Sequence, residues 1–133
     1  MDSLNENKTW ELVAPNAQKA LTGKWVFKIK KKSDGTLRFK ARWVVHGYRQ
    51  QYGIDYNETF ASVVKAVSHR TIISMAAKRN LLMHQMDVVT AFLYGLLDEL
   101  VFVVQPIRFE DGTGRVCRLL KALYGLKQSP RVW

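Results

Sequence analysis

The chain has 133 residues, of which 47% are hydrophobic, enough for one modest domain with its own core, and this composition excludes wholesale disorder. A formal net charge of +10 favours an anionic partner, and the apolar runs are too short to cross a membrane. Cys117 is the only cysteine, which excludes an internal disulfide, and the polar N-terminus does not resemble a signal peptide, so we expect a cytoplasmic or nuclear protein.

The first half of the chain predicts a basic β-hairpin. A short helical turn at residues 2–7 and a strand at 10–13 come first. Residues 24–32 (KWVFKIKKK) alternate apolar and basic side chains, which is typical of a half-buried strand. The sequence SDGT at 33–36 predicts a turn, and residues 37–45 predict the strand that returns from it.

The second half of the chain predicts one helix and several short strands, so the fold class is α+β. Near-helical spacing of apolar residues predicts the helix, and short apolar runs between turn residues predict the strands. The predicted elements are a loop at 47–60, a helix at 65–80, a buried strand at 81–88, a helical turn at 90–94, strands at 100–104 and 116–120, and a helix that begins at Pro130.

The positive charge is concentrated in the hairpin and the residues that follow it. Residues 24–51 carry nine Lys or Arg side chains against one acidic residue, Asp34, and so account for +8 of the total +10. This concentration fits a nucleic acid or a nucleoside triphosphate, a solvated face that keeps the domain soluble, or an anionic membrane surface, and charge alone leaves all three open.

Asp87 lies among apolar residues in the segment LLMHQMDVVTAFLYG. A carboxylate at the end of a buried strand is costly unless its charge is used, and Mg²⁺ is one use because it prefers oxygen ligands. The alternative is an Asp side chain that caps the turn that follows. The segment is too short to decide between them.

Five segments, in order across the chain, resemble the reverse transcriptase domain of copia-type retrotransposons. They are NKTWELV (7–13), GKWVFKIKKKSDGTLRFKAR (23–42), GIDYNETF (53–60), HQMDVVTAFLYG (84–95) and VCRLLKALYGLKQSPRVW (116–133). The resemblance implies part of a right-hand polymerase fold with a mixed or antiparallel sheet, helices and the basic hairpin. It places the fingers at about residues 1–80, the start of the palm at about 81–120, and a further fingers and palm motif at about 121–133.

The resemblance also implies roles for individual residues. Asp87 matches the first catalytic, metal-binding aspartate of the palm and Val88 a backbone metal ligand, in a family that uses two Mg²⁺ ions for nucleotidyl transfer. Lys31 and Arg42 match residues that grip the triphosphate of the deoxynucleotide, and the choice of Lys31 over Lys30 or Lys32 stays open by one position. Phe92 matches the steric gate against a ribose 2′-hydroxyl, or else packs in the core. Candidate contacts to RNA template and DNA primer, or else plain surface-loop residues, are Tyr124, Gly125, Lys127 and Gln128.

The sequence contains no Tyr-x-Asp-Asp segment, which in this family supplies the other palm carboxylates. We therefore expect no polymerase activity from this polypeptide alone, and no tightly bound Mg²⁺. The alternatives are a non-catalytic basic nucleic-acid-binding module and a transposon relic without function. A partial palm leaves apolar surface uncovered, which predicts marginal stability and self-association.

Overall fold

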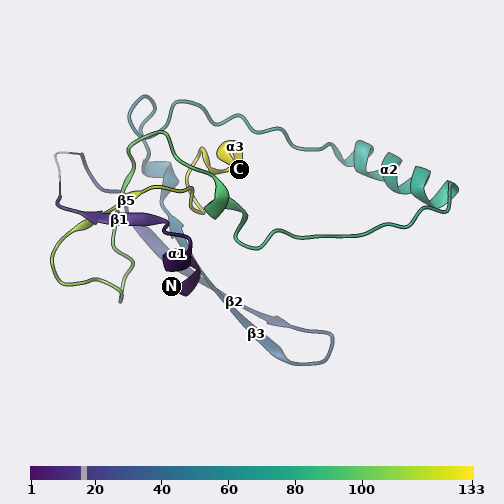
Figure 1. Cartoon of the computed structure of the whole chain (residues 1–133), viewed down its shortest axis with the longest axis horizontal. Coiled ribbons are helices and arrows are strands. Elements are labelled where there is room, and N and C mark those ends of the chain that lie inside the picture. The colour runs from purple at the N-terminus through teal and green to yellow at the C-terminus, as the bar shows by residue number, and fades with distance from the viewer. Residues whose placement is uncertain (16–17) are drawn as a thin grey trace.

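The computed structural model describes residues 1–15 and 18–133 and shows a mixed α+β chain, as the sequence predicts (Figure 1). Its strands form a three-stranded antiparallel sheet in the order β1–β5–β4 and a separate hairpin, β2–β3. The strands are β1 (Trp10–Val13), β2 (Gly23–Lys31), β3 (Leu37–Val45), β4 (Phe102–Val104) and β5 (Val116–Leu119). The helices are α1 (Asp2–Glu6), α2 (Ala66–Lys78) and α3 (Ser129–Val132), with 3-10 turns η1 (Gly47–Arg49) and η2 (Ala91–Tyr94).

Leu21 joins the hairpin to the three-stranded sheet. Its amide donates to the carbonyl of Phe102 at 2.7 Å, and its carbonyl accepts from the amide of Val104 at 2.8 Å. The side chain of Leu21 is buried in the core that both sheets share, so the root of the hairpin is fixed. The buried core residues are Leu21, Trp43, Val45, Leu93, Val101, Val103, Leu119, Leu123 and Leu126.

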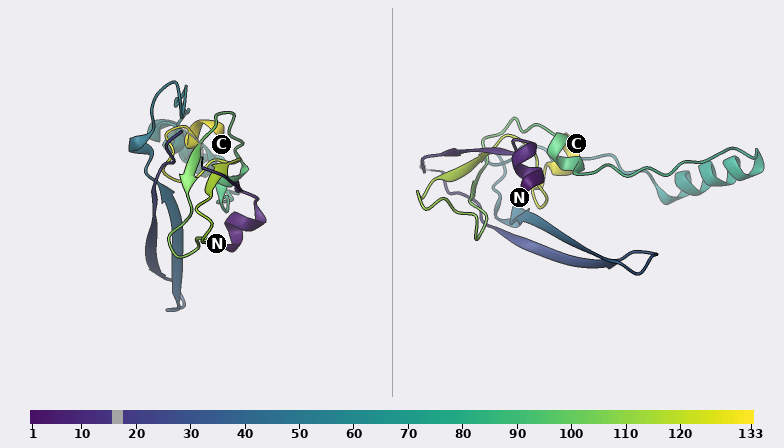
Figure 2. Two further views of the ribbon diagram at one scale, coloured as in Figure 1. Left: turned by 90° about the vertical axis from the view of Figure 1, so that its left-hand side faces the viewer. Right: turned by 60° about the horizontal axis from the view of Figure 1, so that its bottom comes forward.

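The hairpin projects from this core, and only its root is buried (Figures 1 and 2). Trp43 is buried and packs on Trp25, whose ring also contacts Phe109 with centroids 5.7 Å apart. Towards the tip, Phe27 and Phe39 are each 74% exposed. The half-buried strand predicted at 24–32 is therefore wrong for its outer part, because nothing in the described chain covers that face.

The segment between α2 and η2 corrects a second expectation. Residues 81–88 form no strand, and Leu82 and Met86 are 93% and 89% exposed. A strand needs a neighbour to pair its backbone groups, and no described strand lies beside these residues. The apolar run at 81–88 indicates side chains that would be buried against another surface, but the sequence does not identify that surface.

Helix α2 forms where the near-helical spacing predicts it, and it ends at Lys78 just before Asn80, which has a positive φ of 50°. Figure 1 shows α2 held away from the core on two extended arms. Within the described residues, no helix combines the length and the apolar character that crossing a membrane requires.

Candidate nucleic-acid interface

The register of the hairpin sorts its side chains onto two chemically different faces. Residues directly opposite each other in an antiparallel pair point to the same side of the sheet. One face is apolar at most positions, with Trp25 opposite Trp43 and Ile29 opposite Phe39. The other face is basic, and its cations are Lys24, Lys28, Lys30, Arg38, Lys40 and Arg42. We call this second surface the basic face.

Like charges lie directly opposite each other on the basic face. Lys28 pairs with Lys40, and Lys30 pairs with Arg38. The positive charge of Arg42, then burial, then the charges of Lys30 and Arg38 lower the pKa of Lys40 below its ordinary value. Like charges facing each other destabilise a sheet, so a bound polyanion would relieve this repulsion.

The register also decides which lysine accompanies Arg42. Lys31 lies opposite Leu37 on the apolar face, whereas Lys30 and Arg42 both lie on the basic face. In this register Lys30, and not Lys31, shares a face of the hairpin with Arg42. The sequence left this open by one position, and a one-residue shift moves a strand side chain to the opposite face.

Arg42, Tyr124 and Phe92, three predicted site residues far apart in the sequence, come together at the root of the hairpin. The guanidinium of Arg42 lies over the ring of Tyr124, 5.2 Å from its centroid. The ring of Phe92 meets the same ring edge-on, with centroids 4.7 Å apart. Phe92 and Tyr124 are both half-buried, so packing explains Phe92 as well as a steric gate does.

Both the backbone conformation and the close packing at position 125 favour glycine. Its φ is +96°, and a Cβ there would lie 2.0 Å from the carbonyl oxygen of Val45. The adjacent carbonyl of Tyr124 accepts a hydrogen bond from the amide of Val45 at 2.8 Å. The end of β3 thus makes a close backbone approach to Gly125 within the described chain.

Gln128 is buried rather than exposed, which corrects its expected contact with nucleic acid. Its side-chain oxygen accepts from Nε2 of Gln50 at 2.9 Å, and its Nε2 donates to the carbonyl of Asp55 at 2.9 Å. Asp55 is buried too, and its Oδ2 accepts from the amide of Gln51 at 2.8 Å. We call Gln50, Asp55 and Gln128 the buried amide network, which ties the loop after η1 to the segment before α3.

Lys127, next to this network, is exposed. Its backbone amide donates to Oε1 of Gln50 at 2.8 Å, and its Nζ lies 4.6 Å from the ring centroid of Tyr56 and 3.0 Å from the hydroxyl of that residue. Sequence reasoning missed Tyr56 and the neighbouring Tyr52. Tyr56 lies in GIDYNETF and Tyr52 directly precedes it, but neither predicted a structure that would expose a ring.

Asp87 is exposed and lies in the unpaired segment that leads to η2. Its charge reaches the basic face, where it raises the pKa of Lys40 against the larger effects of the neighbouring cations. In the part of the chain described here, no three His, Cys, Asp or Glu side chains gather to hold a metal ion. The residues present therefore do not fit a two-Mg²⁺ centre by themselves, although Asp87 and the carbonyl of Val88 remain free to contribute ligands to one.

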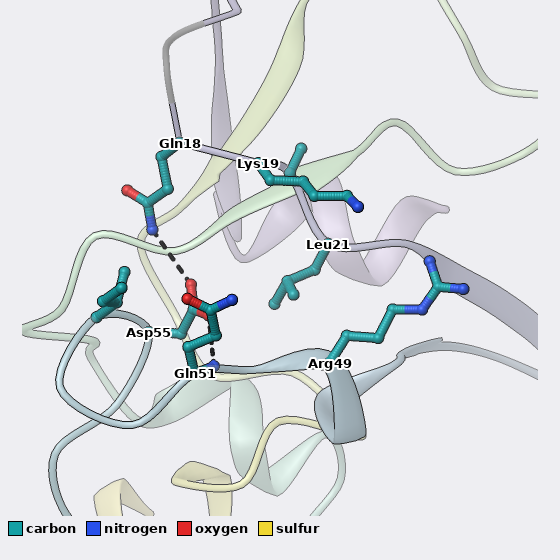
Figure 3. Close-up of a pocket in the computed structure, with 8 residues that line it drawn as sticks. Gln18, Lys19, Leu21, Arg49, Gln51 and Asp55 are labelled. Carbon is teal, nitrogen blue, oxygen red and sulfur yellow. Dashed lines mark hydrogen bonds between the residues drawn. The ribbon is translucent and has the colours of Figure 1, made fainter.

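A cavity of about 390 Å³ lies beside the loop after η1 (Figure 3). Leu21 and Ile54 give it apolar walls, and the side chains of Lys19 and Arg49 extend in the same direction in this view, away from Asp55. Oδ1 of Asp55 accepts from Nε2 of Gln18 at 3.2 Å. The carboxylate of Asp55 is thus committed within the protein, and Lys19 and Arg49 are the cations that line the cavity.

Comparison of the sequence with known proteins identifies one family. Residues 7–133 match the family described as reverse transcriptase (RNA-dependent DNA polymerase). The chain is 50% identical over 137 residues, covering 100% of the chain, to the retrovirus-related Pol polyprotein from transposon TNT 1-94 of Nicotiana tabacum. It is 46% identical over 132 residues, covering 96% of the chain, to that from transposon RE1 of Arabidopsis thaliana. It is 32% identical over 142 residues, covering 100% of the chain, to the Gag-Pol polyprotein of transposon Ty1-DR4 of Saccharomyces cerevisiae.

The chain spans only 10%, 9% and 8% of the length of these three relatives. No solved structure matches it significantly.

Proposed function

Since the chain belongs to the reverse transcriptase (RNA-dependent DNA polymerase) family of copia-type retrotransposons, we propose that it forms part of an RNA-directed DNA polymerase and supplies the basic hairpin that holds the incoming deoxynucleotide. Within a right-hand polymerase, residues 1–80 would contribute to the fingers and residues 81–120 to the start of the palm. Residues 121–133 would complete the junction between them.

The observation that carries this proposal is the basic face. It concentrates six cations on one side of a projecting hairpin, where their mutual repulsion favours a bound anion. Arg42 is held at the root by the ring of Tyr124, and a guanidinium in a fixed position suits paired contacts to phosphate oxygens. RNA template and DNA primer are the further partners that this family implies.

Asp87 would contribute one carboxylate to the metal centre of the polymerase. Because the sequence has no Tyr-x-Asp-Asp segment and the described acidic residues form no cluster, the remaining ligands would have to come from outside these 133 residues. We therefore propose that this polypeptide alone does not extend a primer. Primer extension with Mg²⁺ and deoxynucleotides tests this, and extension that Asp87→Asn abolishes would overturn it.

Calorimetric titration with a deoxynucleoside triphosphate, or with tripolyphosphate as a simpler probe, tests the hairpin. We expect Lys30→Ala and Arg42→Ala each to weaken binding several-fold, because both remove a cation from the basic face. Lys31→Ala is the matched control, since it removes the same charge from the opposite face. Equal losses from Lys30→Ala and Lys31→Ala would show that only net charge matters and that the hairpin is not a specific triphosphate site.

A non-catalytic nucleic-acid-binding module is the second candidate function. Asp87 is exposed, and the described residues gather no group of three His, Cys, Asp or Glu side chains for a metal ion, which favours this function. Filter binding to single-stranded and hybrid nucleic acid at moderate salt distinguishes the candidates. A module keeps specific affinity that Arg42→Ala reduces, whereas a relic without function binds no better than an unrelated basic protein.

A further inference from the structure

Three exposed or half-exposed aromatic rings lie on η1 and on the loop that follows it, outside the triphosphate site. Tyr48 and Tyr52 are 73% and 74% exposed. The rings of Tyr52 and Tyr56 meet edge to face with centroids 5.8 Å apart, and Lys127 lies over Tyr56. We call Tyr52, Tyr56 and Lys127 the tyrosine platform.

Hydrogen bonds, one of them to a buried carbonyl, fix the backbone of the loop that carries the platform. The amide of Gly53 donates to the carbonyl of Tyr56 at 2.9 Å, and Gly53 has a φ of +80°. Between them, the buried carbonyl of Asp55 accepts from Nε2 of Gln128 at 2.9 Å. Burying polar groups is favourable only when they are paired, and here the pairing fixes the backbone on which Tyr52 and Tyr56 stand. One exposed ring, Tyr52, and one half-buried ring, Tyr56, are therefore held on a fixed backbone.

Two cations lie against rings of η1 and of the loop that follows it. Arg49 lies with its guanidinium 5.9 Å from the ring centroid of Tyr48, and Lys127 lies over Tyr56. Of the carboxylates on this loop, Asp55 bonds within the protein and Glu58 pairs with Arg131 at 2.7 Å, while Asp98 and Glu99 line a pocket on the side of Ile54 and Glu58. A ligand that meets the rings thus meets the cations of Arg49 and Lys127 beside them.

The platform and the basic face are linked through one segment of the chain. Tyr124, whose ring lies under the guanidinium of Arg42, and Lys127, which lies over Tyr56, are three residues apart. The same segment therefore takes part in one cation–ring contact at the root of the hairpin and in another at the platform.

We propose that the tyrosine platform binds an unpaired nucleic-acid strand, with bases stacking on Tyr52 and Tyr56 and a phosphate held by the ammonium of Lys127. This rests on the proposed function in one respect, that the chain handles nucleic acid at all. Stacking on an exposed ring requires a base with a free face, so the platform selects single strands over duplexes and is tolerant of sequence.

Fluorescence anisotropy with an end-labelled oligo-dT and a duplex of the same length tests the inference on the whole 133-residue chain. We expect Tyr52→Ala to weaken single-strand binding about tenfold, because one stacked base is lost, and to leave duplex binding unchanged. Tyr52→Phe should retain the affinity because it keeps the ring. Phe39→Ala is the matched control, since that ring is equally exposed but lies on the apolar face of the hairpin.

Two further measurements separate this inference from the proposed function. Lys127→Ala should reduce the slope of log affinity against log salt for oligo-dT by about 0.7, the value for one lost phosphate contact on a single strand. Triphosphate binding should depend on Arg42 and not on Tyr52. If Tyr52→Ala and Phe39→Ala weaken oligo-dT binding equally, or if the duplex binds as well as oligo-dT, the platform is refuted while the triphosphate result stands on its own.

Discussion

Gly47 packs directly against the backbone of Gly125, and a Cβ at Gly47 would lie 1.9 Å from the carbonyl oxygen of Gly125. A backbone oxygen cannot rotate away, so Gly47→Ala should lower the free energy of unfolding by about 3 kcal/mol or more, at the upper end of overpacking costs. Urea denaturation measures this. Gly35→Ala is the control: its φ is +82° but its surroundings are empty, so it should cost only about 1 kcal/mol.

The buried amide network predicts a second stability effect. Gln128→Ala would remove two buried hydrogen bonds, the one that Nε2 of Gln50 donates to Gln128 and the one that Gln128 donates to the Asp55 carbonyl, which costs about 2 kcal/mol. Gln51→Ala removes an exposed side chain of the same type and should change stability by less than about 0.5 kcal/mol. Thermal melts of the two variants compare them, and equal shifts would contradict a structural role for Gln128.

The basic face predicts how Lys40 titrates. Because positive neighbours lower its pKa, Lys40 should release its proton at a lower pH than a free lysine side chain. Arg42→Gln should raise this pKa, since it removes the largest cause. Asp87→Asn should lower it further, since Asp87 favours the charged form. NMR titration of the labelled lysine side chain follows both changes. If Asp87→Asn leaves the pKa of Lys40 unchanged, the carboxylate of Asp87 lies away from the hairpin.

Cys117 predicts an alkaline limit to stability. Burial raises the pKa of its thiol from 9.0 to about 12, with a smaller contribution from the charge of Asp111. Between these values the unfolded chain loses the proton while the folded chain keeps it. The folded state is therefore progressively disfavoured as pH rises above 9.

Denaturation at several pH values should reveal this loss, and Cys117→Ala should remove that part of the pH dependence. In the native protein at pH 8, thiol reagents should modify Cys117 only as fast as the surrounding structure opens.

The uncovered apolar side chains predict self-association. Phe39 on the hairpin, together with Leu82 and Met86 on the segment after α2, present large exposed apolar surfaces to solvent. Replacing Leu82 and Met86 by lysine should shift sedimentation velocity profiles towards monomer at a given concentration. Lys32→Glu, which alters charge at the hairpin turn, should leave the profile unchanged. A wild-type chain that sediments as a monomer with a sharp melting transition would contradict both this prediction and marginal stability.

Much of the local structure follows from the sequence. The hairpin is specified by alternation in β2 and β3 and by the Asp34–Gly35 turn, where Gly35 has the positive φ that the turn requires. Helix α2 follows from the spacing of its apolar residues. The sequence also determined the concentration of charge and the family, because both depend only on which residues occur and in what order.

The tertiary structure decided which way side chains face and what covers them. It placed Lys30 rather than Lys31 on the same face of the hairpin as Arg42, buried Gln128, packed Gly125 against Val45, and left residues 81–88 uncovered. The physical reason is that turn and helix signals arise among residues a few positions apart. Strand phase, burial and close backbone packing depend instead on a second segment, from a distant part of the sequence, that pairs with the first or covers it.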